Sequence, residues 1–78
     1  MPIAFTEEEM TKLRHELILA GIRLSRELGL QRMSVEKITS AVGIAKGSFY
    51  IFFDSKENFI LEIADYANRE TEKMLLAA

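Results

Sequence analysis

The chain has 78 residues, no cysteine and a net charge of −2. This length allows one small domain, and the absence of cysteine excludes disulfide bonds and thiolate metal sites as sources of stability. The sequence contains no run of about 18 apolar residues, so it predicts no membrane span. Glu7, Glu8 and Glu9 stand where a signal peptide has positive charge. We therefore expect a cytoplasmic protein.

The charge is unevenly distributed along the chain. Residues 10–56 contain eight Lys or Arg and four Asp or Glu, whereas the two flanks contain two basic and eight acidic residues. A basic middle segment between acidic ends can offer a positive face to phosphates. A solvated surface of mixed charge is the commoner explanation, so this distribution does not by itself establish nucleic-acid binding.

A long helix is predicted near the N-terminus. Thr6 is a favourable N-cap, and Glu9 follows at the spacing of a capping box, in which each side chain bonds the other residue's backbone N–H. Gly29 stands after the last apolar position, as a glycine that ends a helix does. The apolar residues between them recur at steps of three and four, the spacing of one helix face: Leu13, Leu17, Ala20, Leu24 and Leu28. The sequence predicts a helix over residues 7–28.

Two shorter helices follow. Ser34 opens the second helix, and Gly43 ends it with a backbone that accepts positive φ. Its apolar residues share one face: Val35, Ile38 and Val42. Another helical pattern begins after only two or three further residues, Ile44, Ala45 and Lys46. In it Phe49 and Phe53 stand four apart, which predicts a third helix over residues 46–52.

A fourth helix extends towards the end of the chain. Asp54 and Ser55 interrupt the third helix and cap the fourth. The apolar face of this fourth helix consists of Phe59, Ile60, Ile63 and Tyr66 or Ala67. We therefore expect an all-α fold, a three-helix, homeodomain-like helix-turn-helix bundle followed by the start of a fourth helix.

The second and third predicted helices form a functional unit. Two short helices joined by a glycine-containing turn of three or four residues make a helix-turn-helix, and Gly43 stands in such a turn. The second helix of this unit lies in the major groove of double-stranded DNA, where its N-terminal residues reach base edges. The residues at that place are Ala45, Lys46, Gly47 and Ser48. The hypothesis is a sequence-specific DNA-binding protein.

The chemistry of these four residues suits a DNA groove. Lys46 can neutralise a phosphate or donate to guanine O6 and N7, and Ser48 can bond a base or a phosphate. Ala45 offers a methyl group to a thymine methyl. Gly47 costs about 1 kcal/mol relative to Ala inside a helix, so another demand overrides helix propensity there. Close approach to DNA is one such demand, and closer packing of the first helix is the other.

From Gly47 to Lys56 the sequence has the pattern Gly-x-x-Tyr-x-x-Phe-x-x-Lys. In this pattern above all, and over about residues 14–60, the chain resembles the tetracycline-repressor (TetR) family of bacterial regulators. The other matching residues are Leu17, Ile18, Ala20, Gly29, Ser34, Val35, Ile38, Gly43, Ile44, Lys46, Ser48, Phe49, Ser55, Glu57 and Phe59.

This resemblance implies a DNA-binding head over residues 1–56, with residues 57–78 as a fourth helix that connects to a ligand-binding and dimerisation domain absent from these residues. It implies a transcriptional regulator, in our hypothesis a repressor, that binds a palindromic operator as a homodimer. A small-molecule inducer would bind the absent domain. No cofactor is implied.

The resemblance also implies roles for single residues. Ser34 would bond a phosphate, Tyr50 would place its hydroxyl on the DNA backbone, and Lys56 would hold a phosphate with the backbone N–H groups of the fourth helix. Lys46, Gly47 and Ser48 would face the groove. Three residues depart from the family pattern, and one of them is Ser25, which stands where the family often has Phe. Ala45 replaces the usual Ser or Thr cap, and Phe52, often His or Tyr, can touch DNA only by apolar or stacking contact.

Other classes of function have less support. His15 is the only histidine, so a metal site has few ligands, and Ser48 has no base arranged beside it for nucleophilic catalysis. We therefore expect neither an enzyme nor a metalloprotein. The alternative is an all-α protein-interaction module, suggested by the acidic net charge and by a second apolar edge on the fourth helix: Ile60, Ala64 and Ala67. Salt weakens DNA binding steeply but not an apolar contact, so it distinguishes the two.

Overall fold

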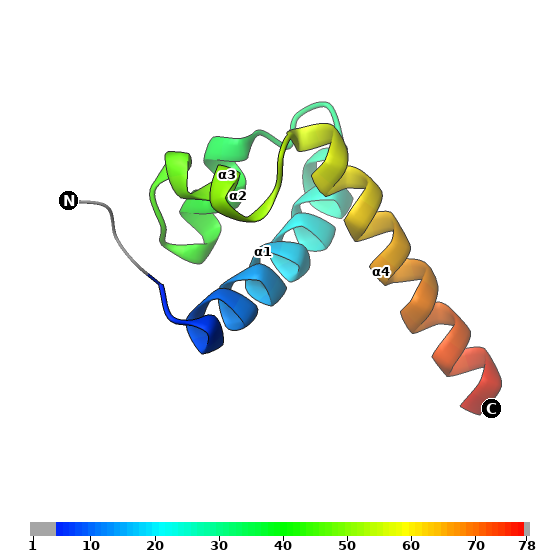
Figure 1. Cartoon of the computed structure of the whole chain (residues 1–78). Coiled ribbons are helices and arrows are strands. Elements are labelled where there is room, and N and C mark those ends of the chain that lie inside the picture. Colours follow the sequence, from blue (N-terminus) through cyan, green and yellow to red (C-terminus); the bar gives the residue numbers. More distant parts are fainter. Residues whose placement is uncertain (1–4, 78) are drawn as a thin grey trace.

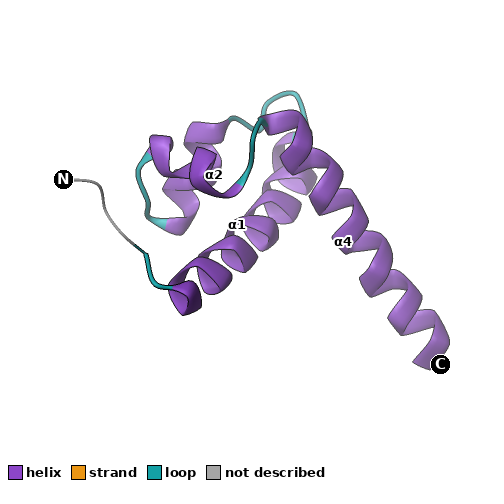
Figure 2. Ribbon diagram, in the orientation of Figure 1, coloured by secondary structure: helices purple, strands orange, loops and turns teal. Residues whose placement is uncertain are grey.

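The structure is a computed structural model that describes residues 5–77. Its helices are α1 (Glu7–Leu28), α2 (Val35–Val42), α3 (Phe49–Phe52) and α4 (Lys56–Ala77), with a 3₁₀ turn, η1 (Lys46–Ser48), directly before α3. Within this described part, the chain consists of helices and connecting loops, without a strand (Figure 2). The predicted all-α fold and the predicted bounds of α1 are confirmed.

Both ends of α1 have the predicted caps. The Glu9 backbone N–H donates to Thr6 Oγ1 at 3.1 Å, and the Thr6 N–H donates to Glu9 Oε1 at 2.9 Å. The backbone N–H of Thr6, and then its side chain, hold the pKa of the Glu9 carboxyl below its ordinary value. At the other end, Gly29 has a φ of 83° and donates to the Ser25 carbonyl at 2.9 Å. Side chains and backbone within four residues thus provide hydrogen-bond partners for backbone N–H and C=O groups that would otherwise have none at the helix ends.

The core lies where α1, α2, α3 and the first half of α4 meet. The rings of Phe49, Phe53 and Phe59 pack together with centroids 4.8 to 5.4 Å apart, a range in which aromatic pairs attract each other. The other buried members of this cluster are Leu17, Ile18, Met33, Val35, Ile38 and Ile63. Because Phe59 and Ile63 belong to α4, the start of this helix is part of the same core as α1 to α3.

A glycine on α1 sets the distance between α1 and α4. A Cβ atom at Gly21 would lie 2.4 Å from Cζ and 2.5 Å from Cε2 of Phe59, closer than real side chains approach each other. The Phe59 ring is fully buried and occupies the space that a larger residue at position 21 would need. The close crossing of α1 and α4 therefore depends on Gly21.

The long helix α1 packs against both α2 and α4 (Figure 1). Arg14 of α1 forms an ion pair with Glu62 of α4, and its guanidinium lies 5.1 Å from the centroid of the Phe53 ring. Beyond this contact, the C-terminal half of α4 projects away from the bundle (Figure 1). Its last apolar side chains are largely exposed: Met74, Leu75 and Leu76. No helix within residues 5–77 is both long and apolar enough to cross a membrane.

Candidate nucleic-acid interface

The helix-turn-helix unit consists of α2, a three-residue turn, and η1 with α3. Ser34 Oγ accepts a hydrogen bond from the Lys37 backbone N–H at 3.1 Å, which is the predicted N-cap of α2. Gly43 has a φ of 86°, and the N–H groups of Gly43 and Ile44 donate to the Thr39 carbonyl at 2.8 and 3.0 Å. Glycine adopts this left-handed conformation without steric cost. The predicted turn is confirmed.

The four residues expected at the base edges lie together at the start of the third helix. Ala45, Lys46 and Gly47 are exposed, and Ser48 is half-buried. Ala45 stands at the N-cap position without a side-chain hydrogen bond, and the Ser48 N–H donates to its carbonyl at 3.0 Å. The predicted helix over residues 46–52 is thus one 3₁₀ turn followed by one α-helical turn. In the 3₁₀ turn the backbone carbonyl of Ala45 accepts the hydrogen bond from the Ser48 N–H, for which the alanine side chain has no acceptor.

Gly47 has no packing role inside the described part of the chain. A Cβ atom at this position meets no heavy atom within 4 Å, whereas one at Gly21 meets Phe59 at 2.4 Å. The backbone at position 47 does not require glycine either, because its φ is not positive. The close packing that was considered for Gly47 therefore belongs to Gly21. The surface above Gly47 is open to a molecule outside the chain.

Tyr50 and Phe52 differ in how much of each ring the core covers. Tyr50 is 53% exposed, and its ring rests edge-on against Phe49 with centroids 5.3 Å apart. Phe52 is half-buried against the core, and its ring lies 6.0 Å from the Phe5 ring. Phe52 therefore packs part of its ring against the core and leaves the rest exposed. Phe52 follows Phe49 by three positions, so its ring borders the buried face of the helix.

Lys56 is the first residue of α4 and is half-buried. Ser55 Oγ accepts a hydrogen bond from the Asn58 backbone N–H at 3.1 Å, so Ser55 caps this helix as predicted. Lys56 thus adds a positive charge to the first turn of α4, where the helix dipole is also positive, and such an arrangement attracts an anion.

The lysines of the helix-turn-helix unit, and Lys56 at the start of α4, have no acidic partners among the described residues. Lys46 and Lys56 form no ion pair within residues 5–77, and Lys37 Nζ donates to the Arg32 carbonyl at 3.3 Å. The ion pairs in that range involve residues of α1 and α4: Arg14–Glu62, Arg69–Asp65 and Lys73–Glu70. An ammonium without a carboxylate partner keeps its attraction for a phosphate.

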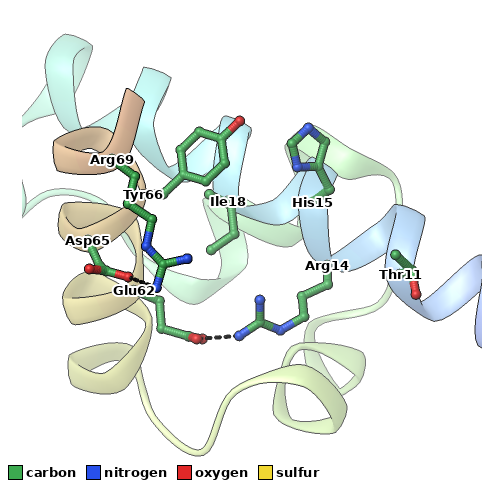
Figure 3. A pocket seen from close by; sticks show the side chains of 8 residues that line it. All are labelled: Thr11, Arg14, His15, Ile18, Glu62, Asp65, Tyr66 and Arg69. Atoms are coloured by element: carbon green, nitrogen blue, oxygen red, sulfur yellow. Dashed lines mark hydrogen bonds and ion pairs between the residues drawn. The ribbon is translucent and has the colours of Figure 1, made fainter. Parts of the chain in front are cut away.

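A polar hollow between α1 and α4 lies outside the helix-turn-helix unit (Figure 3). Arg14 and Glu62 point towards each other across it, and the exposed His15 lies edge-on to Tyr66 with ring centroids 5.7 Å apart. Across the described residues, no three potential metal ligands come together. The hollow contains charges of both signs, of which the Arg14–Glu62 pair connects α1 to α4 and the Asp65–Arg69 pair lies within α4, so it offers no field of one sign to a ligand.

Ile51 is a surface residue of α3 that the sequence pattern did not single out. Half of it is exposed, although it stands in a short helix between the buried Phe49 and the half-buried Phe52. The spacing of Ile51 from Phe49 and Phe53 in the sequence indicates this exposure. Phe49 and Phe53 mark the buried face, and Ile51 lies two positions from each, which on a helix places it on the opposite side.

Comparison with known proteins assigns this region to a family. Residues 17–63 match the family described as bacterial regulatory proteins, tetR family. The HTH-type transcriptional repressor KstR2 of Rhodococcus jostii (strain RHA1) is 44% identical over 50 residues, and the HTH-type transcriptional repressor DhaR of Mycobacterium sp. (strain GP1) is 41% identical over 49 residues. An uncharacterised HTH-type transcriptional regulator, YerO of Bacillus subtilis (strain 168), is 35% identical over 57 residues.

These similarities cover 63% to 73% of this chain but only 20% to 25% of each relative. The chain thus spans a quarter or less of the length of these three relatives. No solved structure matches the chain significantly. The family match covers more than half of the chain, and it contains the whole helix-turn-helix unit together with the first turns of α4. The chain therefore belongs to the tetR family of bacterial regulatory proteins.

Proposed function

We propose that this chain is the DNA-binding part of a transcriptional repressor and that residues 46–52 enter the major groove of a palindromic operator. Gly47 carries the proposal, because it stands in a helix at a cost in propensity and has open space above it. Family membership makes the chain part of a DNA-binding regulator of transcription and not of an enzyme. The names of DhaR and KstR2 support repression as the result of binding.

Three side chains at the start of the third helix contact the bases in this proposal. The exposed Lys46 donates to guanine O6 and N7 or to a neighbouring phosphate, and Ser48 bonds a base or a phosphate. Ala45 lies at the turn, where its methyl group can meet a thymine methyl. Gly47 contributes its lack of a side chain, which lets the backbone come close to the base edges.

Other residues hold the helix in register through the DNA backbone. The Ser34 hydroxyl caps α2 through a lone pair and keeps its own hydrogen for a phosphate oxygen. Tyr50 donates its hydroxyl to the backbone, and Lys56 binds a phosphate together with the N-terminus of α4. Phe52 offers the DNA only the exposed part of its ring, as an apolar contact. The hydrogen bonds and charges of Ser34, Tyr50 and Lys56 on the phosphates position the protein on DNA without reading the base sequence.

A palindromic operator requires two copies of the unit. In a homodimer, two recognition helices about 34 Å apart meet successive turns of the major groove on one side of the DNA. We assign dimerisation, and the binding of any small-molecule inducer, to regions outside the quarter of the relatives that the chain covers. The 78 residues alone are then monomeric or weakly dimeric and bind DNA weakly. The proposed location is the cytoplasm, where bacterial DNA lies.

An NMR titration tests the DNA contact directly. The ¹⁵N-labelled chain is titrated with a palindromic duplex selected from a random-sequence pool and with a scrambled duplex of the same composition, at low and high salt. The amides of Ser34, residues 45–50 and Lys56 are expected to shift together, more strongly with the selected duplex, and salt is expected to reverse the shifts. Amides that stay in place at low salt would contradict the proposal and favour the protein-interaction alternative.

Two substitutions that remove the same charge show whether binding depends on the helix-turn-helix unit or on the net charge of the chain. Lys46→Ala is expected to weaken binding by about 1–3 kcal/mol, because it removes a charge from the groove. Lys73→Ala removes a charge from the last turns of α4, which project away from α2 and α3 (Figure 1), and is expected to have little effect. Equal losses in the two variants would mean that net charge, and not the helix-turn-helix unit, accounts for the binding.

A further inference from the structure

The outermost face of the third helix is apolar. Phe49 and Phe53 are four residues apart, and both are buried, with exposed fractions of 0% and 3%. Ile51 lies two positions after Phe49 in α3, which on an α-helix is a rotation of about 200° and turns Ile51 away from the core. Gly47, in the 3₁₀ turn before α3, is exposed and also faces open space. Ile51 itself is 50% exposed.

The position of Ile51 beside the open surface of Gly47 makes its exposure relevant to the binding of a partner. Single apolar side chains on a protein surface are common and need no explanation. Ile51, however, stands one turn beyond Gly47, where the open surface allows the closest approach of an outside molecule. Its neighbours on the helix carry hydrogen-bonding groups, at Ser48 and Tyr50, whereas Ile51 can neither donate nor accept a hydrogen bond. A partner at this point must offer an apolar group.

Only one base edge in the major groove carries such a group, the 5-methyl group of thymine. We propose that Ile51 determines specificity by packing its aliphatic side chain against a thymine methyl in each half-site, an inference that rests on the proposed insertion of residues 46–52 into the groove. Cytosine carries a hydrogen atom in place of this methyl group, so the isoleucine side chain would lose the apolar contact there. Ile51 thus favours thymine over cytosine.

Replacing thymine with deoxyuridine tests this contact, because it removes the methyl group and leaves every hydrogen-bonding group of the base in place. The protein first selects its binding sequence from a random duplex pool. Each thymine of the selected duplex is then replaced in turn by deoxyuridine, and affinity is measured by fluorescence anisotropy. One position in each half-site is expected to lose about four-fold in affinity, the value of one buried methyl group.

The Ile51→Ala variant completes the double-mutant cycle. It is expected to bind the thymine duplex more weakly than the unchanged protein does and to bind the thymine and deoxyuridine duplexes equally at that position. Ile51→Val, which keeps an aliphatic side chain, should retain most of the preference for thymine. Because Ile51 is half exposed and outside the core cluster, thermal unfolding should show that all three proteins are folded.

The outcomes separate this inference from the proposed function. One outcome is that the protein selects and binds a duplex, but replacing thymine with deoxyuridine lowers the affinity of the unchanged protein and of Ile51→Ala by the same factor. In that case the proposed contact between Ile51 and thymine is wrong, and the DNA-binding proposal stands. The same holds if Ile51→Ala weakens binding to every duplex equally, since Ile51 then contacts the sugar-phosphate backbone. If no duplex is selected even at low salt, where weak DNA binding is strengthened, the proposed function and the inference both fail.

Discussion

Two glycines of this chain have opposite surroundings, because Gly21 packs against a buried ring and Gly47 faces open space. They allow a matched pair of substitutions. Gly21→Ala and Gly47→Ala make the same chemical change, and both add one methyl group to a helical position. The added Cβ lies 2.4 Å from the buried Phe59 ring in the first variant and more than 4 Å from any heavy atom in the second. The two variants are therefore expected to change the free energy of unfolding in opposite directions.

The magnitudes follow from the surroundings of each site. The Phe59 ring has no room to retreat, because the rings of Phe49 and Phe53 lie 5.3 and 4.8 Å away. Overpacking of a core costs about 1–3 kcal/mol, and these short contacts favour the upper end. Alanine recovers about 1 kcal/mol of helix propensity, so Gly21→Ala should lose about 2 kcal/mol. Gly47→Ala pays no such packing cost and should gain up to about 1 kcal/mol.

Urea and thermal unfolding followed by circular dichroism measure both changes. In a domain of this size, each 1 kcal/mol corresponds to a shift of about 4–8 °C in the melting temperature. The same preparations are used for DNA binding, where Gly47→Ala should bind more weakly despite its greater stability. A Gly21→Ala variant as stable as the unchanged chain would refute the close-packing role of Gly21. A Gly47→Ala variant that is more stable and still binds fully would refute the role of Gly47 in DNA approach.

Three further predictions concern caps and charges. Ser34→Ala should cost about 0.5–2 kcal/mol of stability through loss of the α2 cap, whereas Ser34→Asp should restore stability but not DNA affinity, because a carboxylate repels phosphate; unfolding and anisotropy measure the two effects. Lys56→Ala should weaken binding to all duplexes alike and lower the salt dependence, the slope of log K against log salt, by about 0.9. Glu9 has a lowered pKa in the folded chain, so its carboxylate stabilises the fold above its unfolded-state pKa and loses this effect as the pH falls through the folded-state pKa. Glu9→Gln should therefore show a weaker loss of stability than the unchanged chain when unfolding is compared from about pH 6 to about pH 3.

Much of the fold is determined by contacts within a few residues of each other. The ends of α1 depend on Thr6 with Glu9 and on Gly29, and those of α2 depend on Ser34 and Gly43. Each of these groups acts on a backbone atom no more than four residues away, so its effect is visible in the sequence. The spacing of apolar residues likewise predicted which segments are helical, because it depends on the geometry of one helix alone.

Other features depend on residues that are distant in the sequence. Met33 lies between α1 and α2, outside any periodic pattern, and is nevertheless fully buried. Phe52 is partly covered and lies against Phe5, which is 47 positions earlier in the numbering. Helical spacing carries no information about such partners. The role of Gly21 also depends on a distant residue, because only the crossing of α1 and α4 brings Phe59 above it.

The candidate interface divides in the same way. The sequence alone determined the helix-turn-helix segment and placed Ala45, Lys46, Gly47 and Ser48 at its second helix, because the glycine turn and the helical spacing are local properties. Only the tertiary structure decided which glycine serves packing and which is left open, and which side of the third helix faces outward with Ile51. The physical reason is that burial is a property of the assembled helices, whereas a turn or a cap is complete within a few residues of one segment.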